Sequence, residues 1–241
     1  MRLTPFLLSM LLLSTCLAEQ QSTLLFHDGF EHGLGGWDEA VDCSLSAAES
    51  YSGNYSARLG FRRFSVQYLM RRVGAEEQPT GSFVFEFHVK LVRSSMEAVT
   101  LAALVFPTGP VAVAVSKDGR VGLGFGLFEP PVYGGLKLKR GVWVKVQLHI
   151  DYEGERVELY LDDEKALETG LRGRTLPLQE IWIGTIWLGG AGGYGMVMEA
   201  YYDDVALGGE ELLNPKPPIN LIAAAAASAI IGMEFMPLPP S

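Results

Sequence analysis

Short runs in which apolar and polar residues alternate limit what this chain can fold into. The run 83–92 reads Phe-Val-Phe-Glu-Phe-His-Val-Lys-Leu-Val, and similar runs follow at 98–106, 143–150 and 156–161. Successive side chains of a β-strand point to opposite faces, so this period predicts strands with one buried face. No long amphipathic helical pattern lies between 24 and 210, which argues against a parallel α/β sheet.

Turn signals separate these runs at short intervals. Asp118-Gly119 is typical of a tight hairpin turn, and Gly154 marks another turn between two of the alternating runs. Many short strands divided by turns are typical of sandwiches and barrels. We therefore predict an all-β, antiparallel two-sheet sandwich. Glycine at every second position of 121–128 leaves one strand face bare, either for close packing or for a ligand.

Both ends of the chain differ from the middle. Residues 1–18 combine Arg2, an apolar stretch and small residues before Glu19, a pattern that predicts a signal peptide and export. We place one domain at 19–213, and a Pro-rich linker with an apolar, Ala-rich tail at 214–241. The segment 219–236 has three interpretations: a short packed helix, a marginal membrane tether or a disordered tail. Its apolar core is shorter than the about 20 residues that span a bilayer.

Charge and cysteine content exclude several classes of protein. The formal net charge of −9 disfavours nucleic acid and anionic membrane surfaces as partners. Only Cys43 remains after removal of the signal peptide, so no disulfide can form within the domain. No Cys and His spacing indicates zinc.

Four segments resemble a known group of domains. They are an opening Phe-His-Asp-Gly-Phe-Glu-His-Gly followed by Trp37, a Ser-Gly turn that leads into a strand, a Trp-strand-turn-strand unit and a closing Tyr-Tyr-Asp-Asp-Val-Ala-Leu. The chain here resembles concanavalin A-like and laminin-G-like jelly-roll domains and is similar to jelly-roll carbohydrate-binding modules. The resemblance covers about 24–208, and its segments are 26–33, 51–59, 143–163 and 201–207.

The resemblance implies a structural calcium ion between the first and last strands. Calcium takes six to eight oxygen ligands, at about 2.3–2.6 Å. Glu31 and Asp203 match the carboxylates of the resembled modules. Gly29, Tyr51 and Asn54 match the carbonyl donors, and Asp28 and Asp204 are alternates. Acidic residues at strand edges also discourage aggregation, which is the competing interpretation.

Aromatic side chains are the candidates for a ligand site, because the apolar faces of sugars stack on flat rings. The candidates are Tyr194, Trp187, Trp182 and Tyr133, with Trp37 and Tyr202 as further possibilities. A Trp in an alternating strand is more often a core residue. Trp182 and Trp187 are an odd number of positions apart, so in one regular strand they face opposite sides.

These features favour an exported, non-catalytic binding domain with carbohydrate as the ligand. A glycoside hydrolase or lyase is the first alternative. His149-Ile-Asp151-Tyr-Glu153 resembles a hydrolase motif at two of its three acids, and Tyr68, Gln67, His88 and His149 are residue types that lyases use. A structural or adhesive surface protein, tethered by 219–236, is the second alternative.

Overall fold

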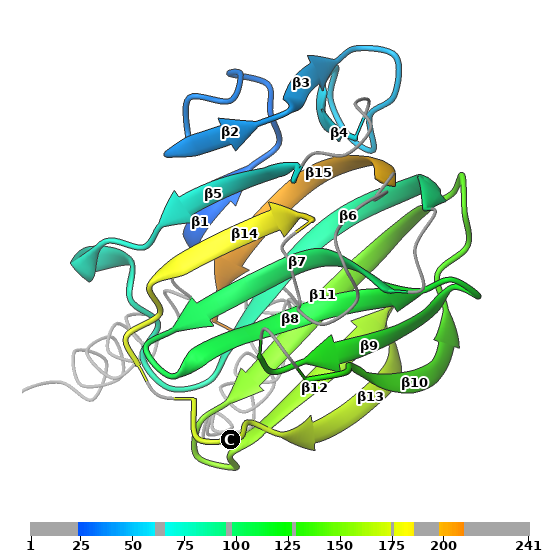
Figure 1. The fold of residues 1–241 in the computed structure, drawn as a ribbon. Coiled ribbons are helices and arrows are strands. Elements are labelled where there is room, and N and C mark those ends of the chain that lie inside the picture. Colours follow the sequence, from blue (N-terminus) through cyan, green and yellow to red (C-terminus); the bar gives the residue numbers. More distant parts are fainter. Residues whose placement is uncertain are drawn as a thin grey trace, which may run out of the picture.

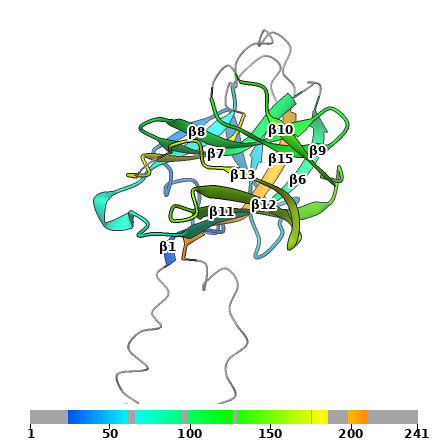
Figure 2. The ribbon, with the colours of Figure 1, turned by 90° about the horizontal axis from the view of Figure 1, so that it is seen from below.

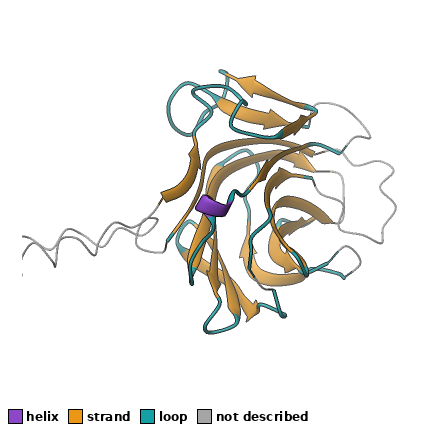
Figure 3. Ribbon diagram, turned by 90° about the vertical axis from the view of Figure 1, so that its left-hand side faces the viewer, coloured by secondary structure: helices purple, strands orange, loops and turns teal. Residues whose placement is uncertain are grey.

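The computed structural model is a sandwich of two antiparallel β-sheets that face each other (Figures 1 and 2). It describes residues 24–60, 66–94, 98–126, 129–174, 176–185 and 198–209. One turn of 3-10 helix, η1 (Ala75–Glu77), is the helical element among these residues, and Figure 3 shows it in purple against the strands. The predicted all-β, two-sheet sandwich is confirmed.

One sheet contains eight strands, in the order β13-β12-β11-β6-β15-β4-β3, with β1 paired to β15. Its strands are β1 (Leu24–Asp28), β3 (Cys43–Ser46), β4 (Ser56–Leu59), β6 (Phe83–Ser94), β11 (Trp143–Asp151), β12 (Arg156–Leu161), β13 (Glu164–Gly170) and β15 (Met198–Gly208).

The other sheet contains seven strands, in the order β10-β9-β8-β7-β14-β5-β2. Its strands are β2 (Glu39–Val41), β5 (Tyr68–Arg72), β7 (Ala98–Phe106), β8 (Gly109–Ser116), β9 (Arg120–Gly124), β10 (Val132–Lys137) and β14 (Glu180–Gly184). The chain crosses between the layers repeatedly, since β5 and β7 lie in this sheet whereas β6 lies in the other.

The core lies between the sheets and is made by every second residue of the central strands. Phe83, Phe85 and Phe87 of β6 are almost fully buried, and Val146 and Leu148 of β11 lie beside them. Burial of each such side chain contributes about 1.5–3 kcal/mol relative to exposure. The alternation that predicted one buried face per strand is therefore what builds this core.

The first and last described strands lie side by side. In β1, Phe26 pairs with Leu207, and Asp28 pairs with Val205 of β15. Figure 1 shows these two strands together at one side of the sandwich. The opening and closing strands of the described residues are therefore paired neighbours in one sheet.

Several sequence predictions concern residues outside the described part of the chain. The signal peptide 1–18, the linker and the tail 214–241 are among them, so they stay predictions. Within the described residues, no helix has the length and apolar character needed to span a membrane.

Candidate functional site

The predicted calcium residues meet where β1, β15 and the loop 49–55 come together, an arrangement that we call the seam. Glu31 Oε1 accepts hydrogen bonds from the backbone N–H groups of Asn54 (2.7 Å) and Tyr55 (2.9 Å). These two bonds lower the pKa of the Glu31 carboxyl below its usual value. Gly53 has φ +57, and a Cβ there would lie 2.4 Å from Glu31 Oε1, so the loop needs glycine at this position.

Asp203 holds the other end of the same loop. Its Oδ2 accepts the N–H groups of Tyr51 (2.8 Å) and Ser52 (3.1 Å), and its Oδ1 accepts that of Asp204 (2.9 Å). The side chain is fully buried, and burial raises the pKa of its carboxyl. Asp204 lies in a register shift of β15 and has φ +46. Its carboxylate accepts a hydrogen bond from the Ser52 hydroxyl (2.9 Å).

Asp28 has a third role at the seam. Its Oδ1 accepts the N–H of Phe30 (2.7 Å), which has φ +61, and its Oδ2 accepts the indole N–H of Trp37 (2.8 Å). Trp37 is 6% exposed and stacks on Phe30 with ring centroids 6.3 Å apart. Asp28 therefore fixes a turn and a core indole, and Trp37 belongs to the core.

At the seam the carboxylates of Glu31 and Asp203 accept N–H groups of the loop. Tyr51 and Asn54, which were predicted to offer carbonyl oxygens, each present their N–H group to one of these carboxylates. The described residues also contain no group of three or more His, Cys, Asp or Glu side chains placed to hold a metal ion. The acids and the loop amides hold the seam together, and calcium stays a prediction of the resemblance.

The outer face of the seven-stranded sheet is the second place where predicted residues meet. Trp182 pairs with Ala103, which pairs with Ala112, which pairs with Gly124. A neighbouring row contains Thr100, Ala114, Gly122 and Tyr133. Alternate residues of these strands belong to the core, so both rows face outward. Short side chains thus form a strip between Trp182 and Tyr133, and we call this side of the sheet the outer face. Thr100, Ala103, Ala112 and Ala114 of the strip are themselves buried, whereas Trp182 and Tyr133 are half-buried.

Two aromatic rings stand together at one side of the outer face. The centroids of Tyr68 and Trp182 are 4.4 Å apart at an interplanar angle of 41°, and both side chains are half-buried. The Trp182 indole N–H donates to Glu180 Oε2 (2.7 Å), and the Tyr68 hydroxyl donates to Glu39 Oε2 (3.0 Å). Burial and then Glu39 raise the pKa of the Tyr68 hydroxyl. Trp182 therefore lies outside the core, with two carboxylates beside the ring pair.

Tyr133 borders the strip on the opposite side. Its ring lies against Gly122, where an added Cβ would be 2.8 Å from Tyr133 Cδ1 and 2.4 Å from Val132 O. The bare face expected from the alternating glycines is used here for close packing of β10. The guanidinium of Arg120 lies 5.6 Å from the centroid of the Tyr133 ring.

The remaining aromatic candidates divide into two groups. Tyr202 is fully buried and its hydroxyl donates to Leu101 O (3.0 Å), so it is a core residue like Trp37. Trp187 and Tyr194 lie outside the described residues, and their roles stay predictions.

The residue types that suggested catalysis do not come together. Tyr68 lies on the seven-stranded sheet, whereas His88 and His149 belong to the eight-stranded sheet. Gln67 is buried, with its N–H bonded to Thr185 Oγ1 (3.0 Å). Asp151 accepts hydrogen bonds from Ser82, Gly154 and Arg156, as expected for an acid that shapes a turn.

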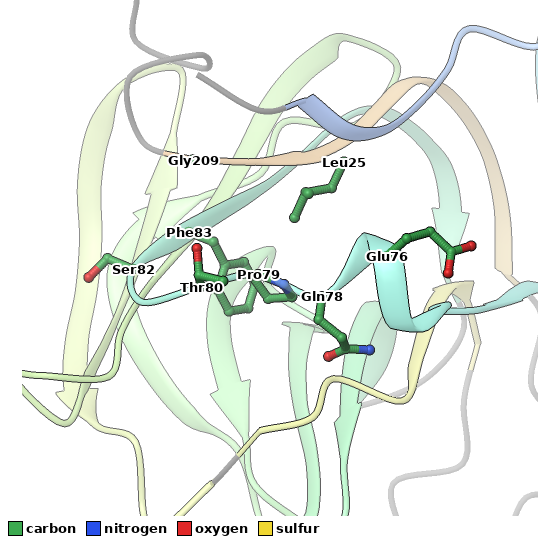
Figure 4. A pocket seen from close by; sticks show the side chains of 8 residues that line it. All are labelled: Leu25, Glu76, Gln78, Pro79, Thr80, Ser82, Phe83 and Gly209. Carbon is green, nitrogen blue, oxygen red and sulfur yellow. The ribbon is translucent and has the colours of Figure 1, made fainter. Parts of the chain in front are cut away.

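A cavity of about 230 Å³ opens elsewhere, near the ends of β1 and β15 (Figure 4). Gln78 is engaged by its own chain, since its amide donates to Leu178 O (2.8 Å) and accepts from Leu178 N–H (2.9 Å). The Ser82 hydroxyl donates to Asp151. No predicted site residue lines this cavity, whose walls are Leu25, Glu76, Gln78, Pro79, Thr80, Ser82, Phe83 and Gly209.

Comparison with known proteins supports the fold. No protein-family model matches the chain, and no curated protein matches it either. Among solved structures, a cellulose-induced protein, Cip1, is similar at a TM-score of 0.58 and 15% identity, over 76% of this chain and 96% of that one. A carbohydrate esterase from the Shiga toxin-encoding bacteriophage phi24B is similar at a TM-score of 0.56 and 10% identity, over 78% and 98%.

A third similar structure concerns botulinum neurotoxin type C, whose cell entry is described as dependent on interaction with two ganglioside molecules. It is similar at a TM-score of 0.51 and 10% identity, over 70% of this chain and 42% of that one, so the match spans less than half of the toxin chain. At these identities the similarities establish a shared β-sandwich fold.

Proposed function

We propose that this chain is an exported carbohydrate-binding domain with a concanavalin A-like jelly-roll fold. Its ligand lies on the outer face of the seven-stranded sheet, against Trp182 and Tyr68. Binding, rather than catalysis, is the proposed role, because the acids singled out as candidates are engaged: Asp151 in a turn, Asp203 in the seam and Glu180 beside the two rings. The predicted signal peptide supports export, and the sequence resemblance supports the jelly-roll assignment.

The pairing of Trp182 with Tyr68 is the observation that carries this proposal. Aromatic side chains that are not needed in the core, and that lie together on a sheet face, offer apolar area with a polar edge. The C–H faces of a sugar ring fit such a surface. Glu180 and Glu39 already accept one hydrogen bond each from the two rings, and a carboxylate has further lone pairs for sugar hydroxyls.

The structural neighbours support the same class of ligand. The names or titles of the three similar structures refer to cellulose induction, a carbohydrate esterase and gangliosides. Fold similarity alone is a weak warrant for function, so the site has to supply the argument.

A glycan array followed by calorimetry with the best ligand tests the proposal. Trp182→Ala removes the larger ring and should weaken binding about tenfold or more, which is about 1.4 kcal/mol. Trp182→Phe, which keeps a ring, should lose less. Tyr160→Ala is the matched control, because Tyr160 lies on β12 of the opposite sheet.

Two results would contradict the proposal. One is a correctly folded protein that binds nothing on a broad array. The other is a ligand whose affinity is equal for the native protein and for Trp182→Ala. Release of reducing sugar or of unsaturated products from array-positive polysaccharides would instead favour the enzymatic alternative.

A further inference from the structure

An exposed aromatic ring also lies on the outer side of the eight-stranded sheet. Tyr51 is 52% exposed, and its ring stacks on His88 with centroids 3.7 Å apart and an interplanar angle of 14°. The backbone of the same residue is fixed, because the Tyr51 N–H donates to the buried carboxylate of Asp203. The ring is therefore held flat on the sheet before any ligand arrives, which lowers the entropic cost of binding.

His88 is the support under this ring. It is 6% exposed, and its Nδ1 has no hydrogen-bond partner among the described residues. Burial lowers the pKa of the imidazole and so favours its neutral form. Leaving a buried polar atom unpaired costs about 1–3 kcal/mol. The contact that His88 makes here is the stack with the exposed Tyr51 ring.

Trp143 extends the aromatic surface beside Tyr51. The two ring centroids are 6.0 Å apart, at an angle of 63°. The core residues of β11 are Val144, Val146 and Leu148, so Trp143 lies on the outer side of that strand. It is half-buried, and its strand partner in β6 is Lys90. We call Tyr51, Trp143 and His88 the platform.

Two ion pairs flank the platform, and the carboxylates of Asp204 and Asp162 also act on His88. Lys90 Nζ lies 2.7 Å from Glu49 Oε2. Lys145, the strand partner of His88, has its Nζ 2.5 Å from Asp163 Oδ1. An ammonium carries three donors and a carboxylate about four acceptor sites, so each pair keeps free hydrogen-bonding capacity. The free hydrogen-bonding capacity suits a neutral, hydroxyl-rich molecule, and the excess of carboxylates disfavours an anion.

We propose that the platform is a second saccharide-binding site, on the sheet opposite the outer face. A neutral sugar ring stacks on the open side of Tyr51, with Trp143 at its edge and the two lysine–carboxylate pairs as hydrogen-bond partners for its hydroxyls. The site shares a ligand class with the proposed function but none of its residues. With sites on both sheets, one domain can join two glycan chains.

Titration by NMR tests the platform on the full chain. The probes are cellohexaose, xylohexaose and maltohexaose, and the readout is the indole N–H signal of Trp143, assigned with Trp143→Phe. At least one probe should shift this signal in the native protein and in Trp182→Ala. Tyr51→Ala should weaken that response about tenfold or more, whereas Tyr51→Phe should keep it.

The outcomes separate the two sites. No shift of the Trp143 signal with any probe overturns the platform, as does an equal response in Tyr51→Ala and in the native protein. Loss of all binding in Trp182→Ala, with none lost in Tyr51→Ala, also overturns the platform and leaves the proposed function intact. The reverse pattern supports the platform and rejects the outer face. If Tyr51→Ala does not fold, Tyr51→Leu replaces it, because Leu keeps bulk without a flat ring.

Discussion

The two sheets cover the same core, but their outer sides differ. On the seven-stranded sheet the central positions are small, such as Thr100, Ala103 and Ala112, with aromatic residues at the sides. On the eight-stranded sheet the equivalent central positions carry Glu86, His88 and similar polar residues. Alternation places the core residues identically in both sheets, so the outward residues are what distinguishes one from the other.

This difference separates stabilising from binding roles. Polar groups of the eight-stranded sheet are mostly engaged with one another or with loop amides, as Gln147 is with Glu86 (2.7 Å) and Asp203 is with Tyr51. The small residues of the outer face leave few such bonds to make. Changes at the seam should therefore reduce stability first, and changes on the outer face should reduce ligand binding first.

The largest effect should come from Asp203→Ala at the seam. Three backbone N–H groups lose their acceptor, at a cost of about 2–4 kcal/mol in the free energy of unfolding. For a domain of this size that lowers Tm by roughly 5–12 °C. Thermal and urea unfolding, followed by circular dichroism, measure the loss.

Glu168→Ala is the control for that variant, because the Glu168 carboxylate pairs with Lys165 in an exposed position. Exposed pairs contribute at most about 1 kcal/mol. Equal stability of the two variants would contradict a stabilising role for the hydrogen bonds to Asp203 at the seam. Glycan affinity on the outer face should stay unchanged in both variants. This measurement is the stricter test of whether the seam and the outer face have separate roles.

Calcium gives the seam a test of its own. From the resemblance, an ion shared by Glu31 and Asp203 should raise Tm over that in a chelator, with a stabilisation of about 2.7 kcal/mol at a hundred times the Kd. Asp203→Asn should abolish the increase. An identical Tm with calcium and with chelator would contradict the predicted ion and leave the N–H bonds as the means of holding the loop.

The strands were predictable because period-2 alternation reports directly on burial. The runs 98–106 and 156–161 coincide with β7 and β12. The positions of Trp143 and Trp182 follow from the same alternation once the strand is known, since their neighbours Val144 and Ile183 are core residues.

The details of the site were harder to predict, because they depend on register and on loop geometry. The contact between Tyr68 and Trp182 joins strands that are far apart in sequence. Asp203 accepts N–H groups of the loop 49–55. Which N–H groups of the loop face this carboxylate depends on the orientation of its peptides, and residue type does not encode that orientation. The stacking of Tyr51 on His88 is a loop-to-sheet contact for which the sequence carries no periodic signal.

Gly122→Ala tests the close packing of β10 at the outer face and should have a smaller effect. The added Cβ would meet Val132 O at 2.4 Å, so β10 has to move and Tyr133 moves with it. Overpacking of this kind costs roughly 1–3 kcal/mol. Gly135→Ala is the matched control on β10, because nothing lies within 4 Å of its Cβ position. Similar unfolding free energies for the two variants would contradict close packing at Gly122.

The smallest effect should be a pH dependence carried by His88. Burial lowers the pKa of its imidazole in the folded state, and this outweighs the attraction of Asp204, which raises it. The unfolded chain, with a His pKa of about 6.5, then binds the proton more readily, so stability falls as the pH falls through that value. His88→Phe keeps a flat ring under Tyr51 and removes the titration. The urea midpoint of the native protein should therefore fall more than that of His88→Phe between pH 7.5 and pH 5.5, and parallel curves would show that His88 is solvated. The acids of the seam are present in both proteins, so the difference between the curves isolates the imidazole.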